Sequence, residues 1–307
     1  MRVWRYFFLP ATFLGAAVAA AAVFGQPVPT TSLGQAAASV PDFSGIWAHL
    51  TWPDVEPPVS GPGPVTNRSR PDGVSNVYLL IGDYTNPILK PVAAEAVKKK
   101  GEIELGGMVS PTPTIQCWPE PVPYIFNGVA MQMLQQPSKI IFLYPNDHQV
   151  RYVRMNVPHR APVTPSWYGD SVGHYEGDTL VIDTVGVKIG PFAMVDFYGT
   201  PYTQALHVVE RYRLLDYEAA KQAEERGQRG LTRVGGDPGF QRNPGYQGRG
   251  LQLEFTVEDG GVFTRPWSAA VSYRRPLGTW PEMTCAENLG HFPGHEAALP
   301  TADRPDF

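Results

Sequence analysis

Ionisable side chains are concentrated in residues 167–184, which read WYGDSVGHYEGDTLVIDT. Turn residues at Gly177-Asp178, followed by the β-branched run TLVID, predict a β-hairpin with a two-residue loop. In that register His174 and Asp183 face the same side of the hairpin. A carboxylate near an imidazole orients the ring and shifts its pKa toward neutral pH, so this face could perform acid–base catalysis. The alternative is a solvated outer face without chemistry.

A second group of ionisable residues lies in the segment 205–214, which reads ALHVVERYRL. On a strand, His207 lies on one face, whereas Glu210 lies on the other face among apolar neighbours. A carboxylate buried there needs a partner, and Arg151 or Arg154 on a neighbouring strand could supply a structural ion pair. The alternative is that Glu210 is an acid or base of raised pKa within a cavity. Both His207 and Glu210 are therefore candidate catalytic residues.

Aromatic and cationic side chains in and around these segments are candidate ligand contacts. The chain has 7 Trp, 14 Tyr and 14 Phe, enough to line an apolar cavity. Ordinary core packing is the simpler explanation at each single position. The candidates for ligand binding are Trp167, Tyr168, Arg211 and Tyr202.

Metal binding and serine-hydrolase chemistry are not predicted. The 7 histidines form neither an HxH nor an HExxH motif, and HExxH is the spacing typical of a zinc protease. The serine at 171 lies in a predicted hairpin, whereas the nucleophile elbow requires a turn from a strand into a helix. We therefore predict no metal and no cofactor.

The rest of the sequence consists mainly of short strands, punctuated by 31 Gly and 32 Pro residues. Besides the hairpin, strands are predicted to start near residue 43 and to cover 139–144, 149–155, 205–214, 250–257, 261–266, 271–275 and 282–285. Two helices are predicted, at 87–100 with a lysine-rich last turn and at 216–226. Sequential hairpins favour a mainly β fold, an antiparallel up-and-down β-barrel of lipocalin type, with a β-sandwich as the alternative.

The first 25 residues have the form of a secretory signal peptide. Arg2 and Arg5 precede an apolar, alanine-rich run. An uncleaved anchor helix is the alternative, which Pro10 and the polar, Pro-rich continuation disfavour. The predicted parts of the chain are a signal peptide at 1–25, a flexible leader at 26–40, a single β-rich domain at 41–290 and a C-terminal tail at 291–307.

Export decides how charge and cysteines are interpreted. Loss of Arg2 and Arg5 reduces 25 Lys and Arg to 23, against 29 Asp and Glu, so the formal charge becomes −6. This charge argues against nucleic acid or an anionic membrane as partner; we predict a small-molecule ligand and no membrane span after signal cleavage. In a periplasmic or secreted protein, Cys117 and Cys285 can form one disulfide, with two buried thiols as the alternative.

Several motifs occur in an order that resembles a family of exported bacterial proteins of mostly unknown function. The longest matches the pattern WxGDSxGxxxGDTLVxDT, and the others are PDFSGIW, KIIFLYPNDHQVRYV, ALHVVERY, FTRPW and EMTCAEN. The resemblance runs from Pro41 to Asn288 and implies a β-rich fold, export and pairing of Cys117 with Cys285, but no activity. The chain departs from the family where relatives carry His-Pro before WxGD and His-Ser before LHVVER, because here those regions read PHRAP and PYT.

Together these features predict an exported, soluble β-barrel that acts on a small, largely apolar molecule. As an enzyme it would use general acid–base catalysis of isomerase, lyase or hydrolase type. The base would be His174 or His207, and Glu210 or Asp183 would orient it or act as a second acid. The alternatives are a periplasmic binding protein without catalysis and an envelope-associated interaction module.

Overall fold

The computed structural model describes residues 40–49, 55–56, 58, 60–68, 80–229, 241–242, 245–277, 280 and 283–285. The predicted signal peptide, almost all of the predicted leader and the C-terminal tail lie outside these residues. Two units divide the chain, Met1–Ser39 and Val40–Phe307, and only the second contains described residues.

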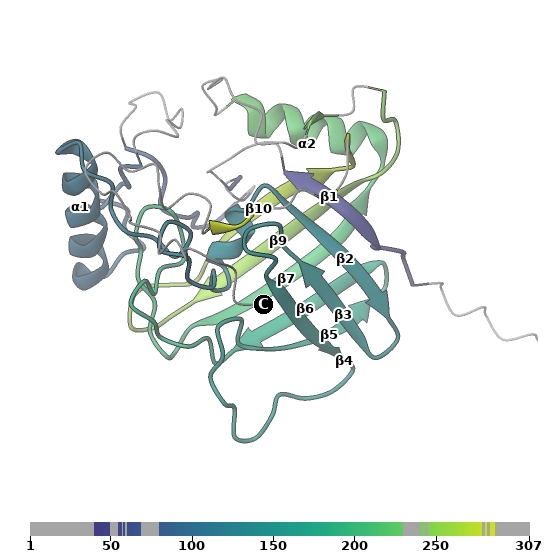
Figure 1. The fold of residues 1–307 in the computed structure, drawn as a ribbon, viewed down its shortest axis with the longest axis horizontal. Coiled ribbons are helices and arrows are strands. Elements are labelled where there is room, and N and C mark those ends of the chain that lie inside the picture. Colours follow the sequence, from purple (N-terminus) through teal and green to yellow (C-terminus); the bar gives the residue numbers. More distant parts are fainter. Residues whose placement is uncertain are drawn as a thin grey trace, which may run out of the picture. The chain divides into compact units, whose positions relative to one another are not determined.

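Nine strands of the described chain close into a β-barrel (Figure 1), which confirms the predicted fold class. The order around the barrel is β1-β10-β9-β7-β6-β5-β4-β3-β2. The strands are β1 (Gly45–His49), β2 (Ala130–Gln136), β3 (Lys139–Leu143), β4 (Val150–Met155), β5 (Asp170–Glu176), β6 (Thr179–Val185), β7 (His207–Leu215), β9 (Gly250–Glu258) and β10 (Trp267–Arg274). A separate two-stranded sheet pairs β8 (Gln241–Arg242) with β11 (Pro276–Leu277).

One strand pair departs from the predicted up-and-down order. β4 and β5 are parallel, whereas every other pair in the barrel is antiparallel. Parallel neighbours need a long crossover instead of a tight turn, and residues 156–169 supply it. This crossover runs outside the barrel, where Val163 packs at Gly186 beyond the end of β6. The end of the barrel at which β4, β5, β7 and β10 begin is called the loop end below.

The β5–β6 hairpin has the predicted register. Glu176 pairs with Thr179 across the two-residue loop, and Gly177 has a φ of +62°. A glycine of positive φ at the first loop position is typical of a type II′ turn, which matches the twist of hairpin strands. The alternation also holds, since Ser171 and Gly173 are buried on the inner face while His174 lies outside.

Large aromatic side chains occupy the barrel interior. Trp47, Phe142 and Tyr212 are at most 1 % exposed. A short 3-10 helix, η1 (Tyr124–Asn127), precedes β2 at the loop end, and its Phe126 ring lies 5.1 Å from Phe255. The core therefore extends from the barrel wall to a segment that covers the loop end.

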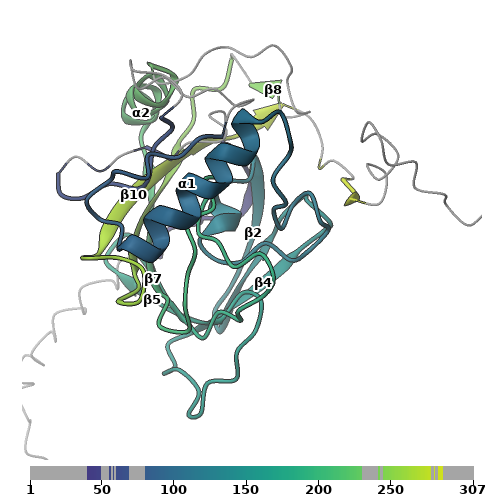
Figure 2. The same cartoon turned by 90° about the vertical axis from the view of Figure 1, so that its left-hand side faces the viewer.

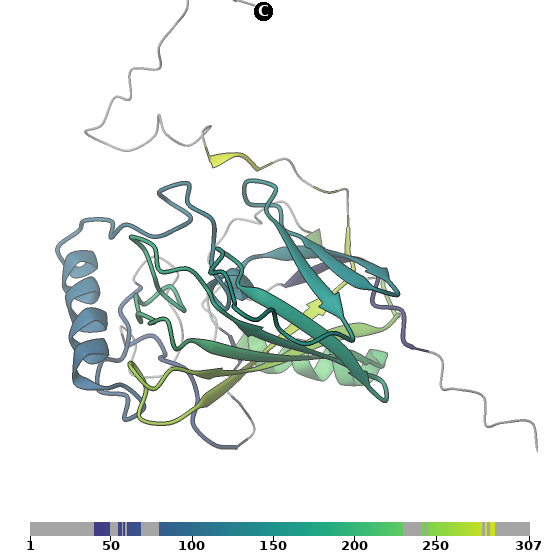
Figure 3. The same ribbon diagram turned by 90° about the horizontal axis from the view of Figure 1, so that it is seen from below.

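Two α-helices lie outside the barrel (Figures 2 and 3). α2 (Tyr217–Arg229) packs against β9 and β10, and Ala220 lies so close that a Cβ at Gly250 would be 2.5 Å from it. α1 (Pro91–Leu105) starts near the β9–β10 turn, where Lys90 N donates to Val262 O. No described helix is long and apolar enough to cross a membrane.

Several predicted boundaries are wrong. α1 starts at Pro91 and continues to Leu105, so the lysines predicted for its last turn lie in its middle. Residues 261–266 form the turn before β10 and not a strand, and 283 makes only an isolated bridge to Asn146. β2 was not predicted, because AMQMLQQ has no β-branched or aromatic residue and its strand conformation depends on tertiary pairing.

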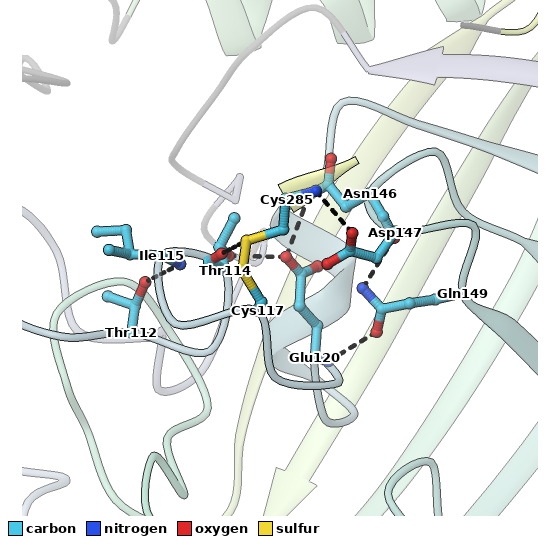
Figure 4. Close-up of a disulfide and its surroundings, with 9 residues drawn as sticks. All are labelled: Thr112, Thr114, Ile115, Cys117, Glu120, Asn146, Asp147, Gln149 and Cys285. Carbon is cyan, nitrogen blue, oxygen red and sulfur yellow. Dashed lines mark hydrogen bonds between the residues drawn. A yellow bond between two sulfur atoms is a disulfide. The ribbon is translucent and has the colours of Figure 1, made fainter. Parts of the chain in front are cut away.

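Cys117 and Cys285 are joined by a disulfide, as predicted (Figure 4). Polar contacts connect its two sides to the β3–β4 turn. Cys285 N donates to Asp147 Oδ1 at 2.7 Å, and the Thr114 hydroxyl donates to Glu120 at 2.7 Å. Burial raises the pKa of Glu120 above its usual value, while hydrogen bonds from Thr114 and Asn146 oppose the rise. The disulfide thus ties residues near the chain's end to the loop end of the barrel.

Candidate histidine–carboxylate site

Four ionisable side chains form a continuous chain of contacts on the outer face of the barrel, at the loop end. They are Asp170, His159, Asp183 and His207, called the histidine–carboxylate cluster below. Asp170 begins β5, Asp183 lies in β6, His207 begins β7 and His159 lies on the β4–β5 crossover. Three adjacent strands and the loop that crosses them therefore build the cluster.

Asp183 is the centre of the cluster because each of its oxygens contacts a different imidazole. His159 Nε2 lies 2.8 Å from Asp183 Oδ1, and His207 Nε2 lies 2.8 Å from Asp183 Oδ2. The other ring nitrogen of His159, Nδ1, lies 3.1 Å from Asp170 Oδ2. The other ring nitrogen of His207 lies 3.6 Å from Glu258 Oε2, beyond hydrogen-bond distance.

The contacts with carboxylates indicate which ring nitrogens of His159 and His207 carry hydrogen. An ionised carboxylate only accepts hydrogen bonds, so both Nε2 atoms facing Asp183 must carry hydrogen. A neutral His207 then has an unprotonated Nδ1, which can take a proton from another molecule. His159 faces carboxylates with both nitrogens, and both contacts are hydrogen bonds only when its ring is an imidazolium. The two histidines therefore differ: both nitrogens of His159 contact carboxylates at hydrogen-bond distance, whereas the Nδ1 of His207 has only the more distant Glu258 beside it.

Asp170 is held more tightly than Asp183. Its oxygens accept hydrogen bonds from Arg154 Nη2 at 2.9 Å and from the Arg160 backbone N–H at 3.0 Å, in addition to His159. Burial alone would raise the pKa of Asp170, but these hydrogen bonds, led by that of the Arg160 backbone, outweigh it and lower the pKa below its usual value. Asp170 is thus an ionised support at one end of the cluster.

The reactive end of the cluster is open to solvent. The side chains of Asp183 and His207 are 36 % and 33 % exposed, whereas that of Asp170 is 4 % exposed. Valines occupy the outer-face positions beside Asp183 in the three-strand register, with Val172 and Val209 directly opposite it. A small molecule can therefore reach His207 over a partly apolar surface.

The other predicted catalytic residues lie apart from this cluster. His174 is on the outer face with a side chain 52 % exposed, and it contacts Glu176 at 3.1 Å. Arg211, a predicted ligand contact, pairs with the same Glu176. The hairpin's polar face is thus the outer face and not the lumen, and for His174 the solvated alternative holds. Hydrogen bonds from Arg211 and His174 lower the pKa of Glu176.

Glu210 points into the barrel and forms the anticipated ion pair with Arg151. Both side chains are fully buried, and Arg151 donates from Nη1 to Oε2 at 2.9 Å and from Nη2 to Oε1 at 2.5 Å. Ser171 and Thr184 accept further hydrogen bonds from this guanidinium, and the Tyr212 hydroxyl donates to Glu210 at 2.9 Å. Both oxygens of Glu210 are therefore bound by side chains of the barrel interior.

The remaining predicted ligand contacts lie in loops of the loop end. The Trp167 ring is 5.3 Å from the partly exposed Trp118, and Lys188 Nζ lies 4.7 Å above it. Tyr202 is 5 % exposed and donates to the Lys188 carbonyl at 2.8 Å. Tyr168 donates to the Gln149 side chain at 2.9 Å. Trp167 and Tyr202 therefore share a neighbour, whereas Tyr168 belongs to a different contact network.

The serine in this region has no catalytic geometry. Residues 169–173 read GDSVG, the G-x-S-x-G spacing of the nucleophile elbow. They lead into and continue along a strand, however, and Ser171 is 2 % exposed with Arg151 and Thr184 as its partners. In the described residues no group of three or more His, Cys, Asp or Glu side chains could hold a metal ion.

Two residues of the cluster, Asp170 and His159, were not predicted as site residues. Asp170 shares its hairpin face with His174, but it was not among the predicted catalytic residues. His159 was seen only as part of PHRAP, where the chain departs from the family pattern. That loop position was the available signal, but a loop residue has no strand periodicity that could place it beside Asp183.

Comparisons with family models, curated proteins and solved structures returned no match for this chain.

Proposed function

We propose that the protein is an exported enzyme that performs general acid–base chemistry on a small molecule at the histidine–carboxylate cluster. The observation that carries the proposal is the Asp183–His207 pair. Its carboxylate holds Nε2 at 2.8 Å, and Nδ1 remains available. A carboxylate that fixes the tautomer of a histidine and stabilises its protonated form is the arrangement that makes imidazole a general base.

Each member of the cluster then has a role. His207 Nδ1 removes a proton from the substrate, and Asp183 holds the ring and stabilises the imidazolium that forms. Glu258, at 3.6 Å, adds negative charge near the same nitrogen. His159 and Asp170 are positioning residues, because they act only through Asp183.

Export and family membership are part of this proposal. The disulfide supports export, since such bonds persist in oxidising compartments. The β-rich fold agrees with what the resemblance to the exported bacterial family implies.

Kemp elimination of 5-nitrobenzisoxazole tests the base without knowledge of the natural substrate. In this reaction a base removes the C3 proton, the N–O bond breaks and a coloured cyanophenolate forms. We expect turnover above the rate in buffer alone. His207→Gln should lower kcat/KM by about 100-fold or more, the range typical of a lost general base, and Asp183→Asn should also lower it by disturbing the tautomer.

The matched control is His174→Gln, which removes another outer-face histidine that also contacts a carboxylate. It should leave turnover unchanged. Equal rates for the wild type and His207→Gln, an equal loss in His174→Gln, or no turnover above the buffer rate would each contradict the proposal.

A further inference from the structure

Three cationic side chains surround the single carboxylate of Asp170, at the β4–β5 side of the histidine–carboxylate cluster. Arg154 Nη2 and Arg160 Nη1 lie 2.9 and 3.3 Å from its Oδ1. His159 Nδ1 lies 3.1 Å from its Oδ2, and the two carboxylate contacts of this ring favour the imidazolium. Even with Asp183 counted, three positive charges face two negative ones. This side of the cluster is therefore locally cationic, although the chain carries a formal net charge of −4.

Both guanidiniums keep N–H groups that Asp170 does not use. A guanidinium has five N–H donors. In the described chain that of Arg160 donates only from Nη1 and that of Arg154 only from Nη2. The side chains of Arg160 and Arg154 are 65 % and 29 % exposed, so an anion from solution can reach them. The planar fork of N–H groups matches the two oxygens of a carboxylate.

A half-buried valine separates these cations from the proposed base. In the outer-face register Arg154 of β4 is the partner of Val172, and Val172 is the partner of Asp183. Neighbouring strands lie about 4.8 Å apart, so two strand spacings, about 10 Å, separate the backbones of Arg154 and Asp183. His207 lies on the next strand, where Val209 faces Asp183. A molecule that reaches from the cations to His207 therefore needs an apolar body of comparable length.

The His207 end of the site disfavours a negative charge. Glu258 Oε2 lies 3.6 Å from His207 Nδ1, and Asp183 contacts the other nitrogen of the same ring. A carboxylate placed there would be repelled by both. Opposite charges at the two ends therefore allow only one orientation of a molecule with a single negative charge.

We propose that the histidine–carboxylate site binds a small carboxylic acid as its monoanion. The carboxylate contacts Arg160 and Arg154, the apolar body crosses Val172, and the uncharged end lies at His207 Nδ1. The inference rests on the proposed function and deepens it, because it names the class of molecule on which the base acts. Arg160 and Arg154 are then the residues that select for negative charge.

Three probes of one shape test this selection on the full chain. They are 4-phenylbutyrate, its neutral amide 4-phenylbutanamide and the cation 4-phenylbutylammonium. We expect the wild type to bind 4-phenylbutyrate saturably in ligand-observed NMR. The amide should bind about tenfold more weakly, the effect of one lost charge-assisted hydrogen bond, and the cation should not compete.

Arg160→Gln should weaken binding of 4-phenylbutyrate by about tenfold and leave that of the amide unchanged. Arg160→Lys keeps the charge without the planar fork, so its affinity should lie between those of the wild type and Arg160→Gln. The matched control is Arg213→Gln, at an outer-face arginine that is 46 % exposed and pairs with Glu254 at 2.9 Å. It should bind all three probes as the wild type does.

The imidazole signals of 13C-labelled histidine report where the uncharged end lies. The Cε1–H signal of His207, identified by its absence in His207→Gln, should shift on titration with 4-phenylbutyrate. The signal of His174, which lies elsewhere on the outer face, should not shift. This measurement needs no turnover.

Three results would overturn the inference. They are equal affinity of the wild type for acid and amide, an equal loss in Arg213→Gln and Arg160→Gln, and an unshifted His207 signal at saturation. Arg160-dependent binding without Kemp turnover would support the inference and contradict only the proposed catalysis. His207-dependent Kemp turnover with equal binding of acid and amide would support the catalysis and overturn the inference.

Discussion

Individual residues show how burial changes the meaning of a charge in this barrel. The Arg151–Glu210 and Arg213–Glu254 pairs have the same chemistry, but the first is fully buried and the second has side chains 46 % and 48 % exposed. A buried ion left without its partner cannot be solvated, whereas an exposed one is solvated by water. The two pairs therefore differ in energy although they look alike in the sequence.

Glu210→Gln should lower the free energy of unfolding by about 3–5 kcal/mol, because Arg151 keeps its buried charge and loses its counter-charge. Glu254→Gln should change it by less than about 1 kcal/mol. Urea denaturation of both variants measures the difference. Equal midpoints for the two variants would show that Glu210 does not stabilise the fold as the counter-charge of Arg151.

Asp170 makes stability depend on pH. Its folded pKa lies below its usual value of 3.8, so the ionised form stabilises the fold at every pH above that value. This contribution is lost as pH falls from 3.8 through the folded pKa. Asp170→Asn should be less stable than the wild type at pH 6, and the gap in urea midpoints should narrow as the pH falls below 3.8, because protonation removes the same charge.

The exposed turn residue Asp178 supplies the control for this pH series. The gap for Asp170→Asn should narrow more than the gap for Asp178→Asn. A constant gap for Asp170→Asn across the pH series would mean that this substitution lowers stability through packing and not through loss of the charge.

At the scale of elements, the β5–β6 hairpin carries Asp170 and Asp183, and its register decides which face they share. Strand residues alternate, so a slip by one position between the two strands would place these two carboxylates on opposite faces. The turn at Gly177 holds this register because an L side chain rarely adopts its φ of +62°.

Gly177→Ala should cost about 1–2 kcal/mol in unfolding free energy through backbone strain alone, since an added Cβ meets no atom within 4 Å. Gly260→Ala is the matched control. It also lies in a turn with open space for a Cβ but without a positive φ. Thermal denaturation should separate the two variants, and an equal effect would show that φ at Gly177 does not matter.

The whole molecule is constrained by one covalent link between segments far apart in the sequence. The disulfide joins Cys117 and Cys285 across a separation of 168 residues. A cross-link over so long a loop reduces the conformational freedom of the unfolded chain, by roughly 4–5 kcal/mol as an upper value in the chain-entropy description.

Non-reducing mass mapping of the native protein should find Cys117 and Cys285 in one cross-linked peptide, and reduction should lower the thermal midpoint. The Cys117→Ser, Cys285→Ser double variant should match the reduced protein and show no further response to reductant. Two thiols that alkylate in the native, unreduced protein would contradict the link.

The local sequence pattern was enough to predict several features of the structure. The β5–β6 register follows from Gly177-Asp178 and the β-branched return strand, because turn chemistry and a two-residue period act within a few neighbouring residues. The carboxylate of Glu210 among apolar neighbours required a cation as its partner. The sequence analysis already named Arg151 and Arg154 as the two candidates. Two cysteines allow only one intramolecular disulfide.

The remaining features depend on contacts between distant parts of the chain. The parallel β4–β5 pair depends on the path of a long crossover, and that crossover brings His159 to Asp170 and Asp183. Which hairpin face is inside depends on barrel closure, so His174 is outside and Ser171 inside. The order of residues along a strand is enough to tell which side chains share a face, because alternation is a local property of strands. Which of them meet depends on strand order, which arises from contacts between residues far apart in the chain.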